Sequence, residues 1–199
     1  MERIGLLGGT FDPPHLGHLW LAEAARQTLK LDKVLFLPAG HPPHKTDEPV
    51  TAVQHRRTMT ALAIGNNDHF TLDMTDAERP SPHYTSTLLP LIQKRNPDVA
   101  LWLLIGSDSL RDLPFWHEPE RVITQCRLAV LPRPGTTVDW VRLSLSVPGV
   151  DQVVETLSGP TIEISSTAIR KWLAAGHQPR YLIPLAVLTY IQEHHLYIR

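Results

Sequence analysis

Residues 8–18 carry the clearest concentration of groups that could bind phosphate: two adjacent glycines are followed by a phenylalanine, an aspartate and two histidines three positions apart. Paired glycines let backbone N–H groups approach an anion, and the start of a helix would add the positive end of its dipole. Histidines at i and i+3 share one helical face, so His15 and His18 could reach the same anion. The pattern predicts a polyphosphate site formed by these residues: Gly8, Gly9, Thr10, Phe11, His15 and His18.

A second phosphate-binding pattern lies far along the chain, where the hydroxyl residues Ser165, Ser166 and Thr167 are followed by Arg170 in the next turn. One hydroxyl could simply cap the helix that is predicted to begin here. Three hydroxyls, free helix N–H groups and a guanidinium together form a better anion site than a cap alone requires. We therefore expect both ends of the chain to converge on one triphosphate.

Two loops between these patterns hold further candidates. His44 and Lys45 follow a proline-rich turn, and turn-forming residues alone would explain this segment. The functional alternative is that both side chains lie over the phosphates and supply positive charge. Gly106 and Asp108 end the most apolar predicted strand, where Asp108 could cap the following helix.

These strings resemble the signatures of the nucleotidylyltransferase superfamily. Gly-x-Phe-Asp-x-x-His-x-Gly-His matches residues 9–18, and Ile-Ser-[Ser/Thr]-[Ser/Thr]-x-[Ile/Val/Leu]-[Arg/Lys] matches residues 164–170. In that superfamily the two histidines contact nucleotide phosphates during nucleotidyl transfer. The Pro-Pro-His-Lys string at residues 42–45 is similar to a loop of the bacterial nicotinate-mononucleotide adenylyltransferases, which narrows the resemblance to one enzyme family.

The resemblance implies that the chain joins nicotinate mononucleotide and ATP to give deamido-NAD and pyrophosphate. Because the attacking 5′-phosphate is already ionised, the reaction needs alignment and charge neutralisation, not a general base. Mg²⁺ would be carried on the ATP phosphates, and Asp12 would orient it or a bound water, or else cap the first helix. The catalytic candidates are His18 and His15 at the α-phosphate and Arg170 at the β/γ end.

The resemblance also divides further residues between the two substrates. In the family a Gly-x-Asp string contacts nucleotide sugars, and Gly106 and Asp108 match it here. The family often has an arginine near ATP, and Arg133 stands in the matching place. In the family a Ser-Tyr-Thr string contacts nicotinate, and His83 stands in place of that serine. A tryptophan stacks on the nicotinate ring, since an indole face suits a pyridinium. The mononucleotide candidates are Thr10, Tyr84, Thr85, Asp108 and Trp116.

Three alternatives stay open. A phosphopantetheine adenylyltransferase shares both signatures but lacks the matches at 42–45, 84–85 and Trp116. A cytidylyltransferase has a different loop after the second strand. A non-catalytic nucleotide sensor on the same scaffold could lose His18 or Arg170 freely, and both are present. The choice between nicotinate and nicotinamide mononucleotide is open on sequence, although bacterial members of the family favour the acid.

Apolar runs alternate with helical patterns along the chain, which favours an α/β fold: a doubly wound, Rossmann-like parallel sheet with helices on both faces. The predicted strands are 4–7, 33–37, 70–73, 99–105, 128–131, 152–155 and 161–164. The predicted helices are 16–29, 53–64, 85–94, 119–125, 166–175 and 184–194. We expect a single domain over residues 1–199, with a C-terminal helical part over about 165–199, and make no prediction for residues 135–149.

Composition adds limits on location and partners. A net charge of −1 offers no basic surface for nucleic acid, and no run of about eighteen apolar residues predicts a membrane span. A single cysteine suits a reducing compartment, so we expect a cytoplasmic protein. No histidine motif, cysteine pair or paired carboxylate completes a four-ligand set, so we expect no protein-bound metal. The oligomeric state is left open. Because Trp20, Trp102 and Trp172 lie in periodic apolar patterns, we expect them in the core.

Overall fold

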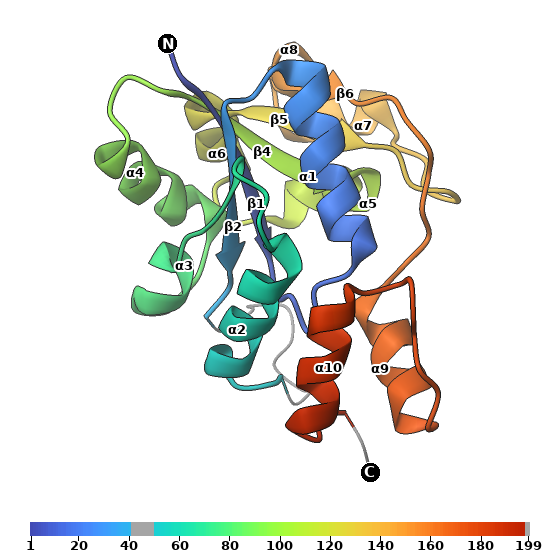
Figure 1. The fold of residues 1–199 in the computed structure, drawn as a ribbon. Coiled ribbons are helices and arrows are strands. Elements are labelled where there is room, and N and C mark those ends of the chain that lie inside the picture. Colours follow the sequence, from blue (N-terminus) through green and yellow to red (C-terminus); the bar gives the residue numbers. More distant parts are fainter. Residues whose placement is uncertain (41–49, 198–199) are drawn as a thin grey trace.

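The computed structural model describes residues 1–40 and 50–197. Within them the strands form a six-stranded, all-parallel sheet in the order β3-β2-β1-β4-β5-β6 (Figure 1). This is the order of a doubly wound nucleotide-binding sheet, in which the chain changes direction between β1 and β4. The fold class predicted from sequence is confirmed. The strands are β1 (Arg3–Gly9), β2 (Lys33–Pro38), β3 (Phe70–Leu72), β4 (Ala100–Gly106), β5 (Arg127–Leu131) and β6 (Val154–Thr156).

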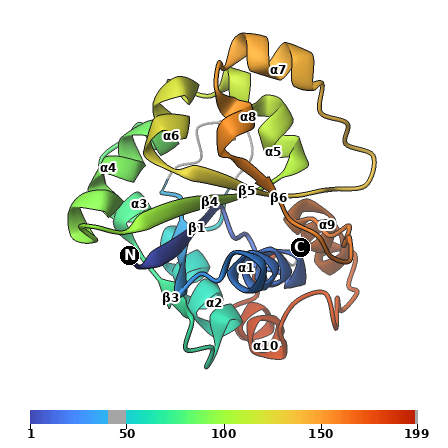
Figure 2. The same ribbon diagram turned by 90° about the horizontal axis from the view of Figure 1, so that it is seen from above.

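Helices cover both faces of the sheet (Figure 2). One face packs against α4 (Thr85–Arg95), α5 (Ser107–Asp112), the 3₁₀ turn η1 (Leu113–Phe115), α6 (Pro119–Gln125), α7 (Trp140–Ser146) and α8 (Val150–Val153). The other face packs against α1 (Leu16–Leu29). Because the central strands are enclosed on both sides, β2 and β4 are continuous apolar runs instead of alternating ones.

A third apolar cluster joins α2 (Val53–Ile64) to α9 (Ser166–Ala174) and α10 (Leu185–Glu193). Met59 and Ala63 of α2 contribute to it beside Ile169, Val187 and Ile191. Figure 1 shows α2, α9 and α10 at the end of the sheet toward which the arrow of β2 points. Ligands of doubly wound sheets bind at this carboxyl end, so the fold places the predicted C-terminal helical part beside the predicted site.

The structure corrects several predicted elements. The predicted strand 161–164 is wrong, because these residues form an irregular segment leading into α9. The predicted strand 152–155 begins only at Val154, since α8 occupies residues 150–153. The four-residue helix α3 (Thr75–Glu78) and the helices α5, α7 and α8 were not predicted, and α7 lies in the segment that had no assignment.

Candidate active site

The phosphate loop, which we define as residues 8–15, joins β1 to α1 and ends at His15, the N-cap of α1. The backbone N–H of His15 donates to Nδ1 of His18 at 3.1 Å. The two imidazole rings stack with centroids 3.7 Å apart, and the Phe11 ring packs edge-on against His18 at 5.0 Å. The two predicted histidines therefore lie together, and the first turn of the helix fixes their orientation.

Both histidines are uncharged at neutral pH. Burial, followed by the Arg133 guanidinium, lowers the pKa of His15 to about 4. Burial, the neighbouring His15 and Arg133 hold the pKa of His18 well below its usual value. Because Nδ1 of neutral His18 accepts a hydrogen bond, its proton lies on Nε2. His18 can therefore offer one N–H donor to an anion.

The start of α9 packs against the phosphate loop. Ser165 caps α9 by accepting a hydrogen bond at 3.2 Å from the backbone N–H three residues on, so one of the three hydroxyls is a cap. Ser166 Oγ donates to the carbonyl of Pro13 at 2.9 Å, and Arg170 donates to the carbonyl of Asp12 at 2.9 Å. The two phosphate-binding patterns predicted at opposite ends of the sequence are thus brought into direct contact.

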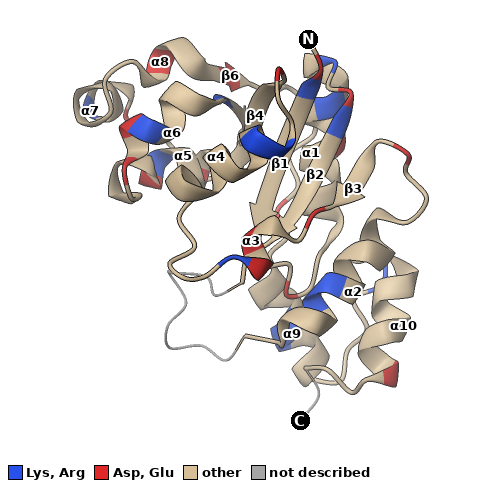
Figure 3. Cartoon of the chain, turned by 90° about the vertical axis from the view of Figure 1, so that its left-hand side faces the viewer, with Lys and Arg blue, Asp and Glu red and all other residues tan. Residues whose placement is uncertain are grey.

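Local basic side chains supply the positive charge that the whole molecule lacks. Arg170 also lies 3.5 Å from the hydroxyl of Thr167. Figure 3 shows basic and acidic residues interspersed over the cartoon, with basic segments on α2 and α9 at the same end of the molecule. His44 and Lys45, which were also predicted to contact phosphate, lie outside the described residues.

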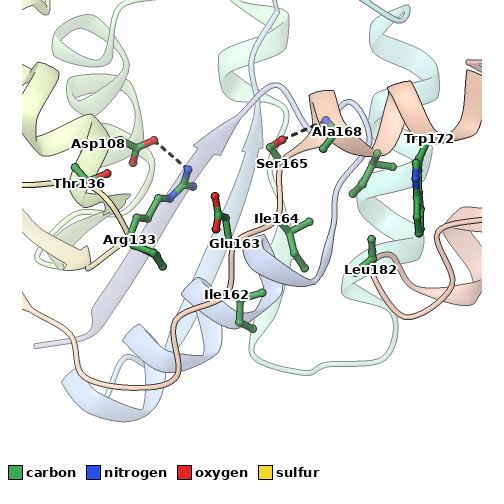
Figure 4. Close-up of a pocket in the computed structure, with 12 residues that line it drawn as sticks. Asp108, Arg133, Thr136, Ile162, Glu163, Ile164, Ser165, Ala168, Trp172 and Leu182 are labelled. Carbon is green, nitrogen blue, oxygen red and sulfur yellow. Dashed lines mark hydrogen bonds and ion pairs between the residues drawn. The ribbon is translucent and has the colours of Figure 1, made fainter.

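The carboxyl end of β4 carries an ion pair. Asp108 Oδ2 accepts a hydrogen bond from Arg133 Nη1 at 3.0 Å (Figure 4). A methyl group on Gly106 would lie 2.4 Å from Asp108 Oδ1 and 2.6 Å from Arg133 Nε, so only glycine leaves room for the pair. Gly106 itself is the N-cap of α5, which contradicts the cap role considered for Asp108. Asp108 Oδ1 is buried without a hydrogen-bond partner among the described residues, and is therefore free to accept one from a ligand.

A cavity of about 560 Å³ lies beside this ion pair (Figure 4). Most of its wall is apolar, with the ion pair at one end and the indole of Trp172 at the other. Trp172 is 50% exposed, so the prediction that it packs in the core is wrong, whereas Trp102 is buried as predicted and Trp20 is partly buried. Its lining residues include Asp108, Arg133, Ile162, Ile164, Trp172 and Leu182.

A second cavity, of about 1170 Å³, extends from the phosphate loop across the ends of β1 and β4. Trp116 lines this cavity and is partly buried. Its indole therefore packs against the core and also borders the cavity. The Tyr84 ring stacks on His117 with centroids 4.1 Å apart, a contact that the sequence did not indicate. All five residues predicted to bind the mononucleotide line this cavity: Thr10, Tyr84, Thr85, Asp108 and Trp116. Asp108 lines both cavities.

Sequence reasoning missed Arg56, a buried residue of α2 that orients the loops. Its guanidinium donates to the carbonyls of Thr10 (2.9 Å), Ala39 (2.8 Å) and Gly40 (3.0 Å), which follow β1 and β2. It therefore ties the two strand ends together. The sequence did contain a signal for Arg56. It occupies the same helical stripe as Met59, Thr60 and Ala63, so a charged residue stands among positions that the pattern assigns to the core.

A second missed group positions the loop that carries Tyr84. Arg79 forms a buried ion pair with Asp76 at 2.7 Å and donates to the carbonyl of Tyr84 at 2.9 Å. His83, the residue that departs from the family string, is hydrogen-bonded to the carbonyl of Asp76 at 2.7 Å and fills the space beside Gly40. His83 is therefore a packing link between the two loops that border the second cavity.

The fold and the site together define the class of protein. Residues 6–172 match the family model described as "Cytidylyltransferase-like". A relative named "Probable nicotinate-nucleotide adenylyltransferase" from Thermomicrobium roseum is 45% identical and covers 99% of this chain and 92% of its own length. A relative of the same name from Roseiflexus sp. (strain RS-1) is 41% identical and covers 98% and 97%. The chain belongs to the nicotinate-nucleotide adenylyltransferase family, which confirms the resemblance seen in the motifs.

Solved structures support the same fold. A Plasmodium falciparum nicotinic acid mononucleotide adenylyltransferase complexed with NaAD superposes with a TM-score of 0.81 at 20% identity, covering 99% of this chain and 98% of that one. A putative nicotinate-nucleotide adenylyltransferase from Vibrio parahaemolyticus gives 0.68, also at 20% identity. At this identity the likeness establishes the shared fold. Separately, none of the helices in residues 1–40 and 50–197 is long and apolar enough to cross a membrane.

Proposed function

We propose that this protein transfers the adenylyl group of ATP to nicotinate mononucleotide, giving deamido-NAD and pyrophosphate for NAD biosynthesis. One observation carries the assignment: two cavities of different size and lining share Asp108. The larger cavity reaches the phosphate loop. A ligand in each cavity would bring two phosphate groups toward the same helix start. This arrangement suits a reaction that joins two nucleotides.

The smaller cavity suits the adenosine of ATP. Its apolar side chains, Ile162, Ile164 and Leu182, offer surfaces for a base, and the Trp172 indole offers a stacking face. Asp108 Oδ1 would accept a hydrogen bond from a ribose hydroxyl. The triphosphate would then extend toward the starts of α1 and α9, where helix dipoles and local basic side chains favour anions.

The larger cavity suits the mononucleotide. Trp116 would stack on the nicotinate ring, whose positive charge is attracted to an indole face. Tyr84 and Thr85 lie at the start of α4, whose dipole favours the nicotinate carboxylate over the neutral amide. Thr10 in the phosphate loop would contact the sugar–phosphate part. All four of these side chains line the larger cavity, which supports their assignment to one substrate.

Transfer would proceed by in-line displacement. A 5′-phosphate oxygen of the mononucleotide forms a bond to the α-phosphorus of ATP while the bond between that phosphorus and the α–β bridging oxygen breaks, and pyrophosphate leaves with the bond electrons. His18 would donate a hydrogen bond from Nε2 to an α-phosphate oxygen. Arg170 would offset charge on the leaving group. Such preorganised donors act mainly by stabilising charge that develops in the transition state.

Mg²⁺ would serve by neutralising charge on the triphosphate and its leaving group. Both carboxylate oxygens of Asp12 are already engaged, one by the Tyr197 hydroxyl and one by the backbone N–H of Thr51. These two bonds hold the carboxylate within the protein, and the ion's ligands would be mainly phosphate oxygens and water, which suits Mg²⁺. His15 is the N-cap of α1, so Asp12 is not the cap of that helix either.

Pyrophosphate release measured with ATP and one acceptor at a time tests the proposal. We expect turnover with nicotinate mononucleotide and a clearly lower kcat/KM with nicotinamide mononucleotide. Turnover with 4′-phosphopantetheine instead would identify the other adenylyltransferase class. Tight ATP binding without pyrophosphate release from any acceptor would identify a nucleotide sensor.

A further inference from the structure

Asp12 is a buried carboxylate in the phosphate loop, and its partners come from distant parts of the chain. It is 2% exposed. Oδ1 accepts a hydrogen bond from the hydroxyl of Tyr197, 185 residues away, and Oδ2 accepts one from the backbone N–H of Thr51. Its own carbonyl accepts from Arg170. Three separate segments therefore converge on this one loop residue.

The hydroxyl of Tyr197 is a stable donor in this position. Tyr197 follows α10, and its ring packs against the cluster that joins α2, α9 and α10. Burial and the Asp12 carboxylate raise the pKa of Tyr197, so the hydroxyl keeps its proton over the physiological range. A buried carboxylate needs such donors, because leaving one oxygen without a partner incurs the full desolvation penalty.

The geometry of the phosphate loop depends on contacts of this kind. Phe11, directly before Asp12, has φ 51°, a left-handed conformation that is strained for a bulky residue and persists only where the surroundings hold it. Arg56 fixes the carbonyl of Thr10 on one side. The loop then runs straight into His15, the N-cap of the helix that carries His18. A shift at Asp12 would therefore move the histidine pair.

We propose that Tyr197 is a positioning residue for adenylyl transfer: its hydroxyl holds Asp12, and through Asp12 it fixes the phosphate loop and the placement of His15 and His18. The inference rests on the proposed function, because it assigns Tyr197 to the geometry of that reaction. It also gives Asp12 a role in the motif, since the carboxylate would serve as the anchor of the loop.

Two matched tyrosine variants test this inference. Tyr197→Phe removes only the hydroxyl that binds Asp12 and keeps the packed ring. Tyr190→Phe removes a comparable hydroxyl bond, to His55 Nδ1 at 2.9 Å, which joins α10 to α2 and does not involve the phosphate loop. We expect Tyr197→Phe to lower kcat about tenfold with both KM values within about twofold of wild type, because misplacement of aligned groups slows the chemical step. Tyr190→Phe should affect only stability, measured by urea unfolding.

Equal kcat losses in both variants, or a kcat for Tyr197→Phe within about twofold of wild type, would overturn the inference. A double-mutant cycle with Asp12→Asn asks whether Tyr197 acts through Asp12. In the Asp12→Asn background, Tyr197→Phe should lower kcat no further. A second tenfold loss there would show an independent effect and overturn the route through Asp12.

A readout that needs no activity separates this inference from the proposed function. Histidine side-chain ¹⁵N NMR of the free protein reports the tautomer and surroundings of each imidazole. Tyr197→Phe should shift the signals of His15 and His18, and Tyr190→Phe only those of His55 and its neighbours. Unchanged His15 and His18 signals would refute the positioning role. Absence of pyrophosphate release from the wild type, with those signals shifted, would refute the proposed function alone.

Discussion

The histidine pair at the start of α1 is held neutral by burial first, and then by neighbouring positive or potentially positive groups. Neutral imidazoles suit a role as hydrogen-bond donors of fixed direction, while Arg170 would supply the permanent positive charge. Only interactions that strengthen in the transition state accelerate the reaction. A fixed Nε2–H of His18 can gain strength as charge grows on the α-phosphate.

The lowered pKa of His15 has a measurable effect on stability. With a pKa of about 4 in the folded protein and 6.5 in the unfolded chain, His15 takes up its proton in the unfolded state first, so stability falls as pH drops below about 6.5. At pH 5 the loss due to His15 is about 2 kcal/mol. Urea unfolding should therefore show that the free energy of unfolding falls less between pH 7.5 and pH 5 in His15→Gln than in the wild type. The difference should be about 2 kcal/mol. His69→Gln, at an exposed site, should behave as wild type.

His18→Ala should mainly affect turnover. Loss of one preorganised donor typically raises the barrier by about 2.7–4 kcal/mol, or about 100- to 1000-fold in kcat. The KM for ATP should change little, because most of the proposed ATP contacts lie elsewhere, in the smaller cavity and on α9. Steady-state kinetics of pyrophosphate release measures both. A kcat near that of wild type would remove His18 from the mechanism, and a large rise in KM with unchanged kcat would make it a binding residue.

At the scale of elements, periodic apolar patterns predicted the long helices well. The bounds of α1 and α2 match residues 16–29 and 53–64, and the shorter α6 also matches its predicted range, 119–125. The four-residue helices α3 and α8 were missed because little more than one turn gives no readable period. The apolar alternation at 161–164 indicated a strand, but no strand borders it and Ile162 and Ile164 line a cavity instead.

The site was predictable where a motif is local and unpredictable where topology brings residues together. The glycines and histidines of residues 8–18 lie close together in the sequence, so their spacing and the family signature indicated them. Tyr197 reaches Asp12 only because α10 packs on α2, and no sequence pattern encodes that contact. Arg56 is intermediate, since its place in the buried stripe of α2 was visible but its carbonyl partners were not.

The junction of β4 and α5 gives a prediction at this scale. Gly106 has φ −83°, which any residue can adopt, so Gly106→Ala should fold. Its new methyl group would still displace Asp108 and Arg133, both within 2.6 Å of it. We expect kcat/KM for ATP to fall at least about tenfold, on the scale of one lost charge-assisted interaction, with thermal stability nearly unchanged. Wild-type kcat/KM would show that the ion pair does not serve the nucleotide.

At the scale of the whole molecule, the topology explains why both cavities exist. The chain leaves β1 in one direction and β4 in the other, which opens a crevice between their carboxyl ends. The larger cavity lies across that crevice, and the segment from β6 to α9 closes the smaller one. Asp108, which follows β4, stands between them. Each substrate should therefore depend on one cavity wall and not on the other.

Two tryptophan variants test this separation. Trp172→Ala should raise the KM for ATP about tenfold, the scale of one base-stacking contact, and leave the KM for nicotinate mononucleotide within about twofold. Trp116→Ala should do the reverse, because the two indoles line different cavities. Trp140→Ala is the matched control, since Trp140 of α7 is partly exposed and absent from both linings. If Trp172→Ala altered only the mononucleotide KM, the substrates would be assigned to the wrong cavities. If both variants raised both KM values equally, the cavities would act as one site, and the division at Asp108 would have no functional meaning.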